Sequence, residues 1–269
     1  MREHAPTAGR ALALVVCLLL GVSDLGGAVE DDAVAPDRPD VTNSTQTVPP
    51  GAVQLETGLE YSRASQADAP AERRLALQGT LRVGVTTRLE LRLEGEPLVR
   101  LRGSDEDTGP GEWALGLKYR FLDQAEPSWR PSLGLHAFVK LPTAREPIGS
   151  GRADVGVLAL ATWDLPWDLG LDVNAGVAAV GQSHPDGYLI QGLVSASLSK
   201  QITERLSGFV ELFFASRDRR DGRDNVGFDT GVLFLLTRAL AADAAVGTLL
   251  GGRGPDYVFR AGLSLRLGR

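Results

Sequence analysis

The sequence of 269 residues contains one cysteine and three histidines, and aromatic residues make up only 6% of it. The cysteine, Cys17, lies in an apolar N-terminal run, and Val16 precedes it where a lipid-attachment site needs a small residue. If that run is removed during export, the remaining chain has no cysteine, which excludes disulfides and cysteine-based metal sites. The low aromatic content predicts a thin girdle at any membrane interface.

Long hydrophobic runs and basic clusters are also missing. Beyond residue 28, no apolar run approaches the roughly 18 residues that a transmembrane helix needs. The formal net charge of −6 and the lack of a basic cluster argue against nucleic acid as a partner. The mean hydropathy of −0.04 is too low for a helical membrane protein, but it is typical of strands in which apolar and polar residues alternate.

The N-terminus has the pattern of an export signal. Arg2 and Arg10 supply the positive charge at its start, and residues 11–22 form an apolar core. Gly26 and Ala28 are small residues that fit the positions before a cleavage site. We therefore predict that residues 1–28 are a signal peptide, since the core is too short to anchor the chain across a bilayer. An exported chain without a retaining helix resides in the periplasm, the outer membrane or the medium.

From Val53 to the end, segments of about ten residues alternate between apolar and polar side chains, as strands do when they have two different faces. In the first segment Val53, Leu55, Leu59 and Tyr61 alternate with Gln54, Glu56, Glu60 and Ser62. Twelve such segments follow one another, separated by turn-forming residues. The pattern predicts an all-β fold over residues 52–269: a single closed antiparallel transmembrane β-barrel of about 12 strands.

The expected strands are 52–62, 74–84, 88–98, 112–121, 131–141, 152–163, 169–180, 188–199, 206–215, 226–236, 240–247 and 257–267. The connections support this division because their lengths alternate, with short periplasmic turns and longer extracellular loops. The expected short turns are 84–87, 164–168, 200–205 and 237–239, with 122–130 as a longer member. The expected long loops are 99–111, 142–151, 181–187, 216–225 and 248–256. An exported β-sandwich would also alternate, but its strands average only about five or six residues.

Charged side chains fall on the face opposite the apolar one, so we expect them to line the lumen, since a charge on the lipid face costs roughly 2–4 kcal/mol near the midplane. The acidic members are Glu56, Glu60, Glu90, Glu94, Glu96, Asp154, Asp172, Glu211, Asp229 and Asp243. The basic members are Arg74, Arg82, Arg92, Lys118, Arg120, Lys140, Arg260 and Arg266, and His136 shares their face. Where the last strand meets the first, ion pairs of Arg260 and Arg266 with Glu56 and Glu60 are expected.

Two further segments are candidate parts of a pore. Residues 29–51 are acidic at first, then rich in Thr, Ser, Asn and Pro without periodicity, which indicates an extended lead in the periplasm or the lumen, or a disordered tail. The loop after the fifth expected strand contains Pro142, Thr143, Gly149, Ser150 and Gly151, and it could fold inward as a constriction because glycine permits unusual turns.

Three stretches resemble the MetA-pathway phenol-degradation family of bacterial outer-membrane proteins, also labelled transporters. They are Asp-Arg-Pro-Asp at 37–40 with Val-Pro-Pro-Gly at 48–51 and Gln-Leu-Glu at 54–56; Lys-Leu-Pro-Thr at 140–143 with Gly-Ser-Gly at 149–151 and Asp154; and the closing strand 261–267. The resemblance implies a twelve-stranded outer-membrane barrel that passes small molecules, hydrophobic or aromatic compounds among them. One departure is Leu267, where such barrels end in an aromatic residue that the insertion machinery reads.

The sequence has little material for catalysis. His136 and His184 are the histidines left after export, no serine stands at a recognisable spacing from His136, and no Gly-x-Ser-x-Gly motif occurs. The acidic run at residues 105–107 lacks the spaced oxygens of a calcium loop. We expect no enzymatic activity, no cofactor and no metal, although an outer-membrane lipid enzyme is an alternative that the residues leave open.

The sequence therefore predicts an outer-membrane channel or transporter of a Gram-negative bacterium, with lipid, small solutes and the barrel-insertion machinery as partners. The alternative from another class is a barrel closed by its own ion pairs that serves structure or adhesion. An open bore would favour transport, whereas a lumen packed with side chains would favour the structural role.

Overall fold

The computed structural model describes residues 33–65, 70–104, 106–125, 129–183 and 185–268. The strands are β1 (Val53–Ala64), β2 (Glu72–Thr86), β3 (Leu89–Arg102), β4 (Asp107–Gly109), β5 (Trp113–Leu122), β6 (Ser132–Leu141), β7 (Asp154–Leu165), β8 (Leu169–Ser183), β9 (Asp186–Gln201), β10 (Leu206–Ala215), β11 (Asn225–Leu235), β12 (Leu240–Gly251) and β13 (Tyr257–Leu267). The predicted signal peptide, the first residues of the lead and Asp105 lie outside the described residues.

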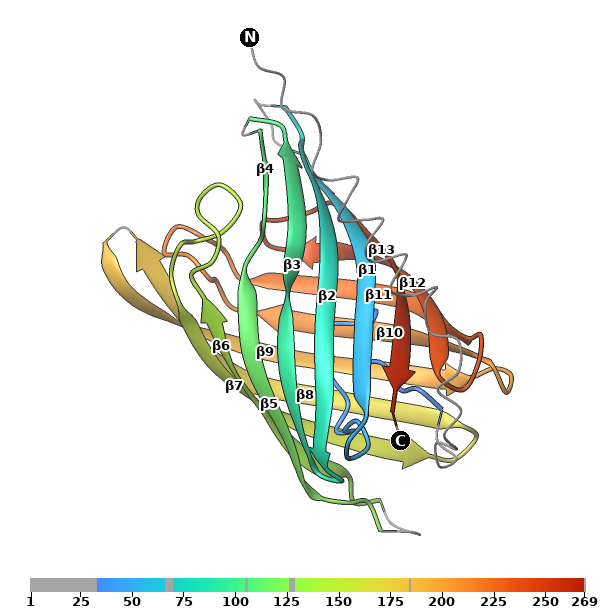
Figure 1. Cartoon of the computed structure of the whole chain (residues 1–269). Helices are drawn as coiled ribbons and strands as arrows, with labels where there is room; N and C mark the ends of the chain where they lie inside the picture. The colour runs from blue at the N-terminus through green and yellow to red at the C-terminus, as the bar shows by residue number, and fades with distance from the viewer. Residues whose placement is uncertain (1–32, 66–69, 105, 126–128, 184, 269) are drawn as a thin grey trace.

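Twelve long strands form one closed antiparallel barrel, as the alternation predicts. Each long strand pairs with its neighbours in sequence, and β1 pairs with both β2 and β13, so the sheet returns to its starting strand. In Figure 1 the strands at the front cross those at the back, because all of them tilt around the barrel. Closure leaves no unpaired edge among these strands, which is what a sheet in hydrocarbon requires. A two-sheet sandwich is thereby excluded.

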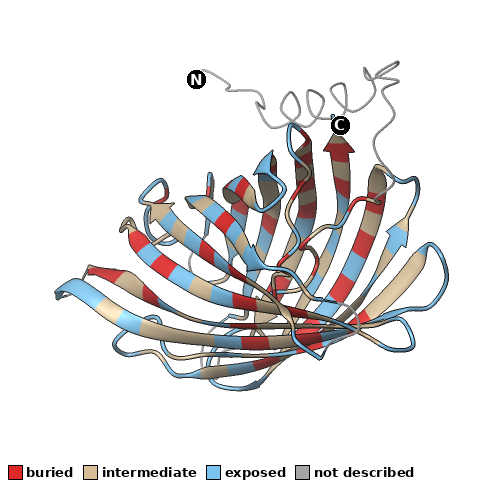
Figure 2. Cartoon of the chain, turned by 90° about the horizontal axis from the view of Figure 1, so that it is seen from below, coloured by how far each residue is buried: buried red, intermediate tan, exposed pale blue. Residues whose placement is uncertain are grey.

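The two faces of the sheet have opposite chemistry. On β1, Gln54 and Glu56 are 2% and 1% exposed, whereas Leu59 is 54% exposed. The same alternation runs along the other strands, visible as bands of colour in Figure 2. The exposed apolar side chains belong to the outward face, and they include Leu75, Leu91, Leu115, Leu135, Val155, Val177, Val194, Leu212, Val232 and Phe259. This outward band is the surface expected to contact lipid.

The connections differ in length between the two ends of the barrel. At the end that holds residues 87–88, 166–168, 202–205 and 236–239, turns are short, and 123–131 is the longer member. At the opposite end, the longer connections are 65–71, 142–153 and 216–224. The predicted long loop at 181–187 is wrong. Gly181 pairs with Tyr188 and Gln182 with Gly187, so β8 and β9 continue as a ladder through residues that resemble a turn.

The strand β4 is absent from the sequence-based prediction. It pairs with the far end of β3, where Arg100 lies opposite Thr108 and Leu101 opposite Asp107. The strands β2 and β3 are correspondingly longer than expected and reach Glu72 and Arg102. Alternation does continue through residues 98–102, but Pro97 and the charges beyond it have the composition of a loop. Within the described residues, no helix has the length and hydrophobicity needed to cross a bilayer.

Candidate functional site

The lead lies inside the barrel. It enters at the short-turn end, where the Val34 amide donates to the Arg238 carbonyl at 2.7 Å. It then crosses the lumen and returns to the same end, where the Gly51 amide donates to the Gly84 carbonyl at 2.9 Å. The contacts between these points involve side chains from most of the wall. Residues 33–51 (hereafter the lead) therefore form a plug across the half of the barrel at the short-turn end.

The backbone of the lead is held by polar side chains of the strands. Glu211 of β10 accepts the amides of Val41 and Thr42 at 2.9 and 2.6 Å. Further along, Asn174 of β8 accepts the Asn43 amide at 2.7 Å, and Thr162 of β7 accepts the Thr45 amide at 2.9 Å.

On the opposite wall, Glu90 of β3 accepts the Val48 amide at 2.8 Å. A segment with no secondary structure of its own must find partners for its buried amides, and here the wall supplies them. The polar side chains of the lumen face therefore match the backbone amides of the lead in position.

Arg82 of β2 is the centre of a buried ion cluster, and its side chain is 1% exposed. Its Nε and Nη2 donate to the two carboxylate oxygens of Glu90 at 2.9 and 3.0 Å. Its Nη1 donates to Glu56 Oε1 at 2.9 Å. The same guanidinium also donates to the carbonyls of Ala35 and Gln46 in the lead, at 3.2 and 3.1 Å. One side chain thus joins β1, β3 and both arms of the lead.

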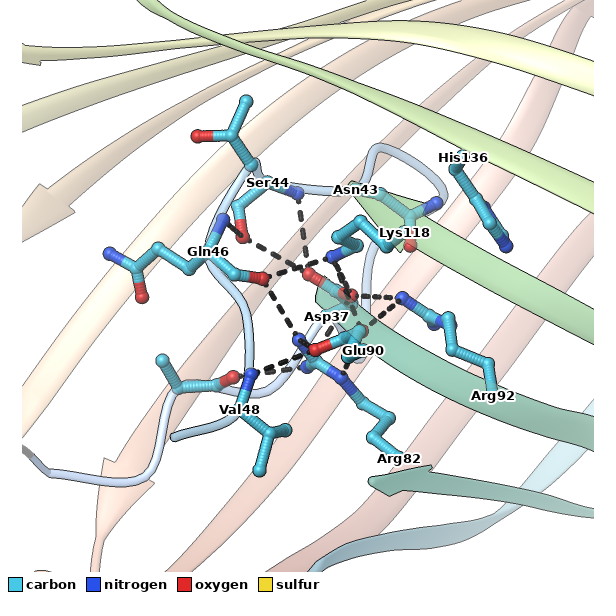
Figure 3. A network of polar contacts seen from close by, with 12 residues as sticks. Asp37, Asn43, Ser44, Gln46, Val48, Arg82, Glu90, Arg92, Lys118 and His136 are labelled. Atoms are coloured by element: carbon cyan, nitrogen blue, oxygen red, sulfur yellow. Dashed lines mark hydrogen bonds and ion pairs between the residues drawn. The ribbon is translucent and has the colours of Figure 1, made fainter. Parts of the chain in front are cut away.

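Asp37 completes the cluster from the lead (Figure 3). Its Oδ2 lies 2.5 Å from both Arg92 Nη1 and Lys118 Nζ, and 3.3 Å from Arg82 Nη1. Its Oδ1 accepts the Ser44 amide and hydroxyl at 3.3 and 3.1 Å. The strands bring three cations to this place together with the carboxylates Glu56, Glu90 and Glu94. Lys118 lies 3.9 Å from Glu90, whereas Asp37 of the lead lies 2.5 Å from it, so the close ion pair of Lys118 depends on the seated lead.

Two aspartates of the lead have opposite protonation behaviour. Burial alone would raise the pKa of Asp37, but the charges of Arg82, Lys118 and Arg92 hold it well below its ordinary value. Asp40 lies on the other side of the lead, where burial and the nearby charges of Glu211 and Asp172 raise its pKa well above its ordinary value. Asp37 is therefore anchored as an anion, whereas the neutral form of Asp40 is favoured.

A second group of ion pairs lies further from the short-turn end. Arg260 of β13 contacts Glu60 of β1 at 2.9 Å and Asp229 of β11 at 2.5 Å. Arg74 of β2 contacts Glu60 at 3.4 Å and Glu96 at 2.5 Å. The expected ion pair between Arg260 and Glu60 at the closure is confirmed.

The other arginine expected at the closure has a different neighbour. Arg266 stands opposite Gln54 in the register, and its Nη1 donates to the Ala33 carbonyl at 3.4 Å. The Oε1 atom of Glu56 is instead bound by Arg82. The sequence placed Arg266 and Glu56 on the same face of neighbouring strands. The register does not set them opposite one another, because Glu56 stands opposite Ser264.

Replacing Arg260 with glutamine should lower the temperature at which the folded barrel unfolds. The change removes two charge-assisted contacts that join β13 to β1 and β11, worth about 1–3 kcal/mol. Heat-modifiability on denaturing gels measures the transition. The control is Arg253→Gln, which alters an exposed loop arginine and should leave the transition within experimental error. An unchanged Arg260→Gln transition would show that backbone pairing alone sets the strength of the closure.

Lys140 of β6 binds residues on both sides of the loop that was predicted to form a constriction. Its Nζ lies 2.7 Å from both Glu112 and Asp154, and it donates to the Ser150 hydroxyl at 3.0 Å. Glu112 Oε1 also accepts the Ser150 amide at 2.9 Å. The loop at 142–153 is therefore tied to the wall between β5 and β7.

The other predicted constriction residues shape this loop. Thr143 accepts the Trp113 amide with its hydroxyl at 3.0 Å, Gly151 has a φ of 66°, and Gly149 donates to the Arg145 carbonyl. Pro142 begins the loop. A constriction by this loop stays a prediction, because the lumen contacts described here belong to the lead.

The other residues predicted to line the lumen have separate partners. Asp243 binds Arg38 of the lead at 3.3 Å, and Asp172 accepts the Thr162 hydroxyl at 2.5 Å. Arg120 lies 2.8 Å from Asp123 near the short-turn rim. Glu94 accepts a hydrogen bond from Arg92 Nε. All of them lie on the inward face, but only part of the set forms one cluster.

His136 lies beside the central cluster without a catalytic arrangement. Its Nε2 is 3.9 Å from Glu94 Oε1, and its ring packs 6.0 Å from that of Phe138. Neither contact provides a nucleophile. Among the described residues, no group of three or more histidines, cysteines and carboxylates is placed to hold a metal ion.

A cavity of about 340 Å³ lies on the outer side of the lead. Its floor includes Asp37, Arg38 and Asp40, and its wall includes Glu60 and Arg260. The bore is therefore open above the lead and filled at the lead itself. This space is large enough for a small organic molecule.

Sequence reasoning missed the polar residues of the lead and the aromatic residues of the lumen. Asp37 and Arg38 were part of a family motif, but a chain without periodicity gives no sign of which wall residues it contacts. Phe138 shares its face with His136, and Phe213 shares its face with Glu211, so both rings point inward. Each lies opposite a glycine, Gly156 and Gly227 respectively, a pairing that could have been found only with the register.

Comparison with known proteins places the chain in a family. A sequence family described as "Putative MetA-pathway of phenol degradation" matches residues 36–267, which includes most of the lead and all the strands. The chain belongs to this family. The match begins inside the lead, so the plug and the barrel are parts of one family pattern. No curated protein matches the sequence.

Solved structures with the same fold are outer-membrane barrels. The COG4313 outer membrane channel of Pseudomonas putida F1 is 15% identical, with a TM-score of 0.65 over 87% of this chain and 100% of that chain. The NanC porin is 12% identical, with a TM-score of 0.52 over 80% and 100%. The KdgM porin is 8% identical, with a TM-score of 0.53 over 81% and 99%. At these identities the likeness concerns the fold, which is that of an outer-membrane β-barrel.

Proposed function

We propose that this protein is an outer-membrane channel for small molecules, and that the lead is its gate. The single observation that carries the proposal is the buried ion cluster at the centre of the lumen, in which Asp37 of the lead contacts Arg82, Arg92 and Lys118 of three different strands. A permanent filling of the lumen could be achieved with wall side chains alone. A separate segment held by ionic and hydrogen-bonded contacts can instead leave and return.

The solutes that we propose are small organic compounds, aromatic ones among them. Two observations support this class: the cavity above the lead is about 340 Å³, and Phe138 and Phe213 lie on the lumen face among the charges. The family description points in the same direction. Mixed charges of both signs would solvate polar substituents, while the rings offer stacking contacts to an aromatic solute.

A disulfide that fixes the lead to the wall tests the gate. The hydroxyls of Thr42 in the lead and Ser195 of β9 are 2.8 Å apart, so cysteines at both positions can approach bonding distance. The predicted mature chain has no other cysteine. In planar bilayers the oxidised Thr42→Cys/Ser195→Cys protein should be closed, and a reductant should restore the conductance of the wild type.

The matched control is each single cysteine variant, whose current should not respond to the reductant. Equal currents from the oxidised and reduced double variant would show that solutes do not pass the lead. If the wild type, the reduced double variant and a variant lacking residues 33–47 were all silent, the alternative of an ion-paired structural barrel would replace the channel.

Selective permeation tests the solute class. Liposomes containing the reduced protein should swell faster in benzoate than in an aliphatic carboxylate of similar size, because the aromatic ring can stack in the lumen. The Phe138→Leu/Phe213→Leu variant should lose that preference while keeping its conductance to small ions. Equal swelling in the two solutes would remove aromatic compounds from the proposal.

A further inference from the structure

Four arginines on the outward face form a compact patch at the far end of β1, β2 and β3. In the register, Arg63 of β1 stands opposite Arg73 of β2, and Arg73 stands opposite Arg102 of β3. Arg100 of β3 lies one step below this row, opposite Leu75. Neighbouring strands are about 4.8 Å apart, so three arginines stand side by side within about 10 Å.

The face of the sheet on which they lie is the lipid-facing one. Leu75, which is 42% exposed, shares its row with Arg100 and Tyr61, while the alternating residues Ala76 and Val99 are fully buried. Arg73, Arg100 and Arg102 are exposed and Arg63 is half-buried. The patch therefore sits at the upper border of the apolar band, where charges cost little.

Aromatic side chains continue the same rows. Tyr257 of β13 stands opposite Arg63, and Phe259 stands opposite Tyr61. The rings of Tyr61 and Tyr257 lie 6.3 Å apart, and those of Tyr257 and Phe259 lie 5.3 Å apart. Amphipathic rings gather at the level of the lipid headgroups, so they place the arginine row at that depth.

Like charges directly opposite one another in a sheet repel. In the lumen, Arg82 and Arg92 stand opposite one another, but Glu90 and Asp37 contact both of them. The arginines of the outward patch lack such compensation. Among the described residues, none of the four arginine side chains forms an ion pair, and the Nε of Arg63 is buried without a hydrogen-bond partner.

The nearby carboxylates are placed elsewhere. Asp107 stands opposite Leu101, whose face is the other one, and Asp256 accepts the Ser65 amide and hydroxyl at 2.9 and 2.6 Å. Glu106 and Asp107 line the same hollow of about 700 Å³ as three of the arginines, and two carboxylates are fewer than the four cations. Within the part of the chain that the structure describes, the patch therefore has an excess of positive charge that an external anion can balance.

We propose that Arg63, Arg73, Arg100 and Arg102 bind the phosphate groups of a phosphorylated lipid in the outer leaflet. Guanidinium groups bind phosphate through paired hydrogen bonds, and a lipid brings its phosphates to the depth of this row while its acyl chains cover Leu75 and Phe259. The site lies on the outside of the barrel, so it is independent of passage through the lumen.

Binding of diphosphoryl lipid A to the full mature protein in neutral detergent tests this site. Native mass spectrometry over a lipid titration should show roughly a hundredfold weaker binding for Arg73→Gln/Arg100→Gln/Arg102→Gln, as expected for three arginines at a membrane surface. The control is Arg219→Gln/Arg220→Gln/Arg223→Gln, which removes the same charge from an exposed loop and should bind like the wild type.

Three results would overturn the proposal. They are equal binding by the patch variant, equal binding of lipid A from which the phosphates have been removed, and full displacement by millimolar inorganic phosphate, which would indicate a site for free anions. Arg73→Lys/Arg100→Lys/Arg102→Lys guards against misfolding of the glutamine variant, because lysine keeps the charge. Its affinity should fall between those of the wild type and the glutamine variant, since lysine loses the paired geometry.

Discussion

Replacing Asp37 with asparagine should open the channel. The change removes the carboxylate charge that lies 2.5 Å from Arg92 and Lys118 and 3.3 Å from Arg82, and it leaves Lys118 with Glu90 at 3.9 Å. Loss of one partner from a buried ionic cluster costs about 3–5 kcal/mol. If about 3 kcal/mol of this falls on the seated state, the ratio of unseated to seated lead rises roughly a hundredfold. Single-channel recording in planar bilayers should show a large increase in open time.

Asp40→Asn is the matched control for this experiment. It makes the same chemical change three residues away in the same segment, at a carboxyl group whose raised pKa favours the neutral form. Because asparagine resembles that neutral form, the lead should stay seated and the conductance should remain that of the wild type. If Asp37→Asn conducted no better than Asp40→Asn, the ion cluster would not be what holds the lead, and the hydrogen bonds to Glu211 would become the next candidate.

Replacing Arg82 with methionine should cause the largest loss of stability in the barrel. Arg82 contacts Glu56, Glu90 and Asp37 at once, and it also binds two carbonyls of the lead. Its removal leaves carboxylates buried without their cation, at a cost of about 3–5 kcal/mol. Urea unfolding of protein folded into vesicles measures this loss as a lower midpoint.

Two comparisons make the result specific to the buried cluster. Arg88→Met removes an arginine that is 49% exposed and paired with Asp123, and exposed pairs are worth at most about 1 kcal/mol. The double variant Arg82→Met/Glu90→Gln should regain part of the lost stability, because it neutralises one of the carboxylates that lose Arg82 as their partner. A loss of less than 1 kcal/mol in Arg82→Met would mean that water reaches the cluster and screens it.

Most of the barrel could be derived from the order of apolar and polar residues. The period of two in residues 53–62 shows which side chains share a face, and twelve repeats of that pattern indicate the number of strands. The faces of Glu56, Arg82 and Lys118 follow from the same rule, because a charge is too costly on the lipid side. The prediction failed at residues 181–187 and 99–102, where glycine or charge interrupts the pattern although the strand continues.

The contents of the lumen could not be derived in this way. Periodicity says that Arg266 and Glu56 face inward, but it does not set the register of β1 against β13, which places Gln54 opposite Arg266. It also says nothing about the lead, since a segment without secondary structure has no period. The partnership of Asp37 with Arg92 and Lys118 depends on residues 55 and 81 positions apart in the chain.

The sequence by itself determined that the chain forms a membrane barrel with a charged interior, because the two faces of each strand meet two solvents of opposite polarity. Only the tertiary structure decided that residues 33–51 occupy one part of the interior and that three outward arginines stand in one row. Both features arise from relations between distant segments, which depend on how the closed sheet aligns its strands and not on the order of residues within any one of them.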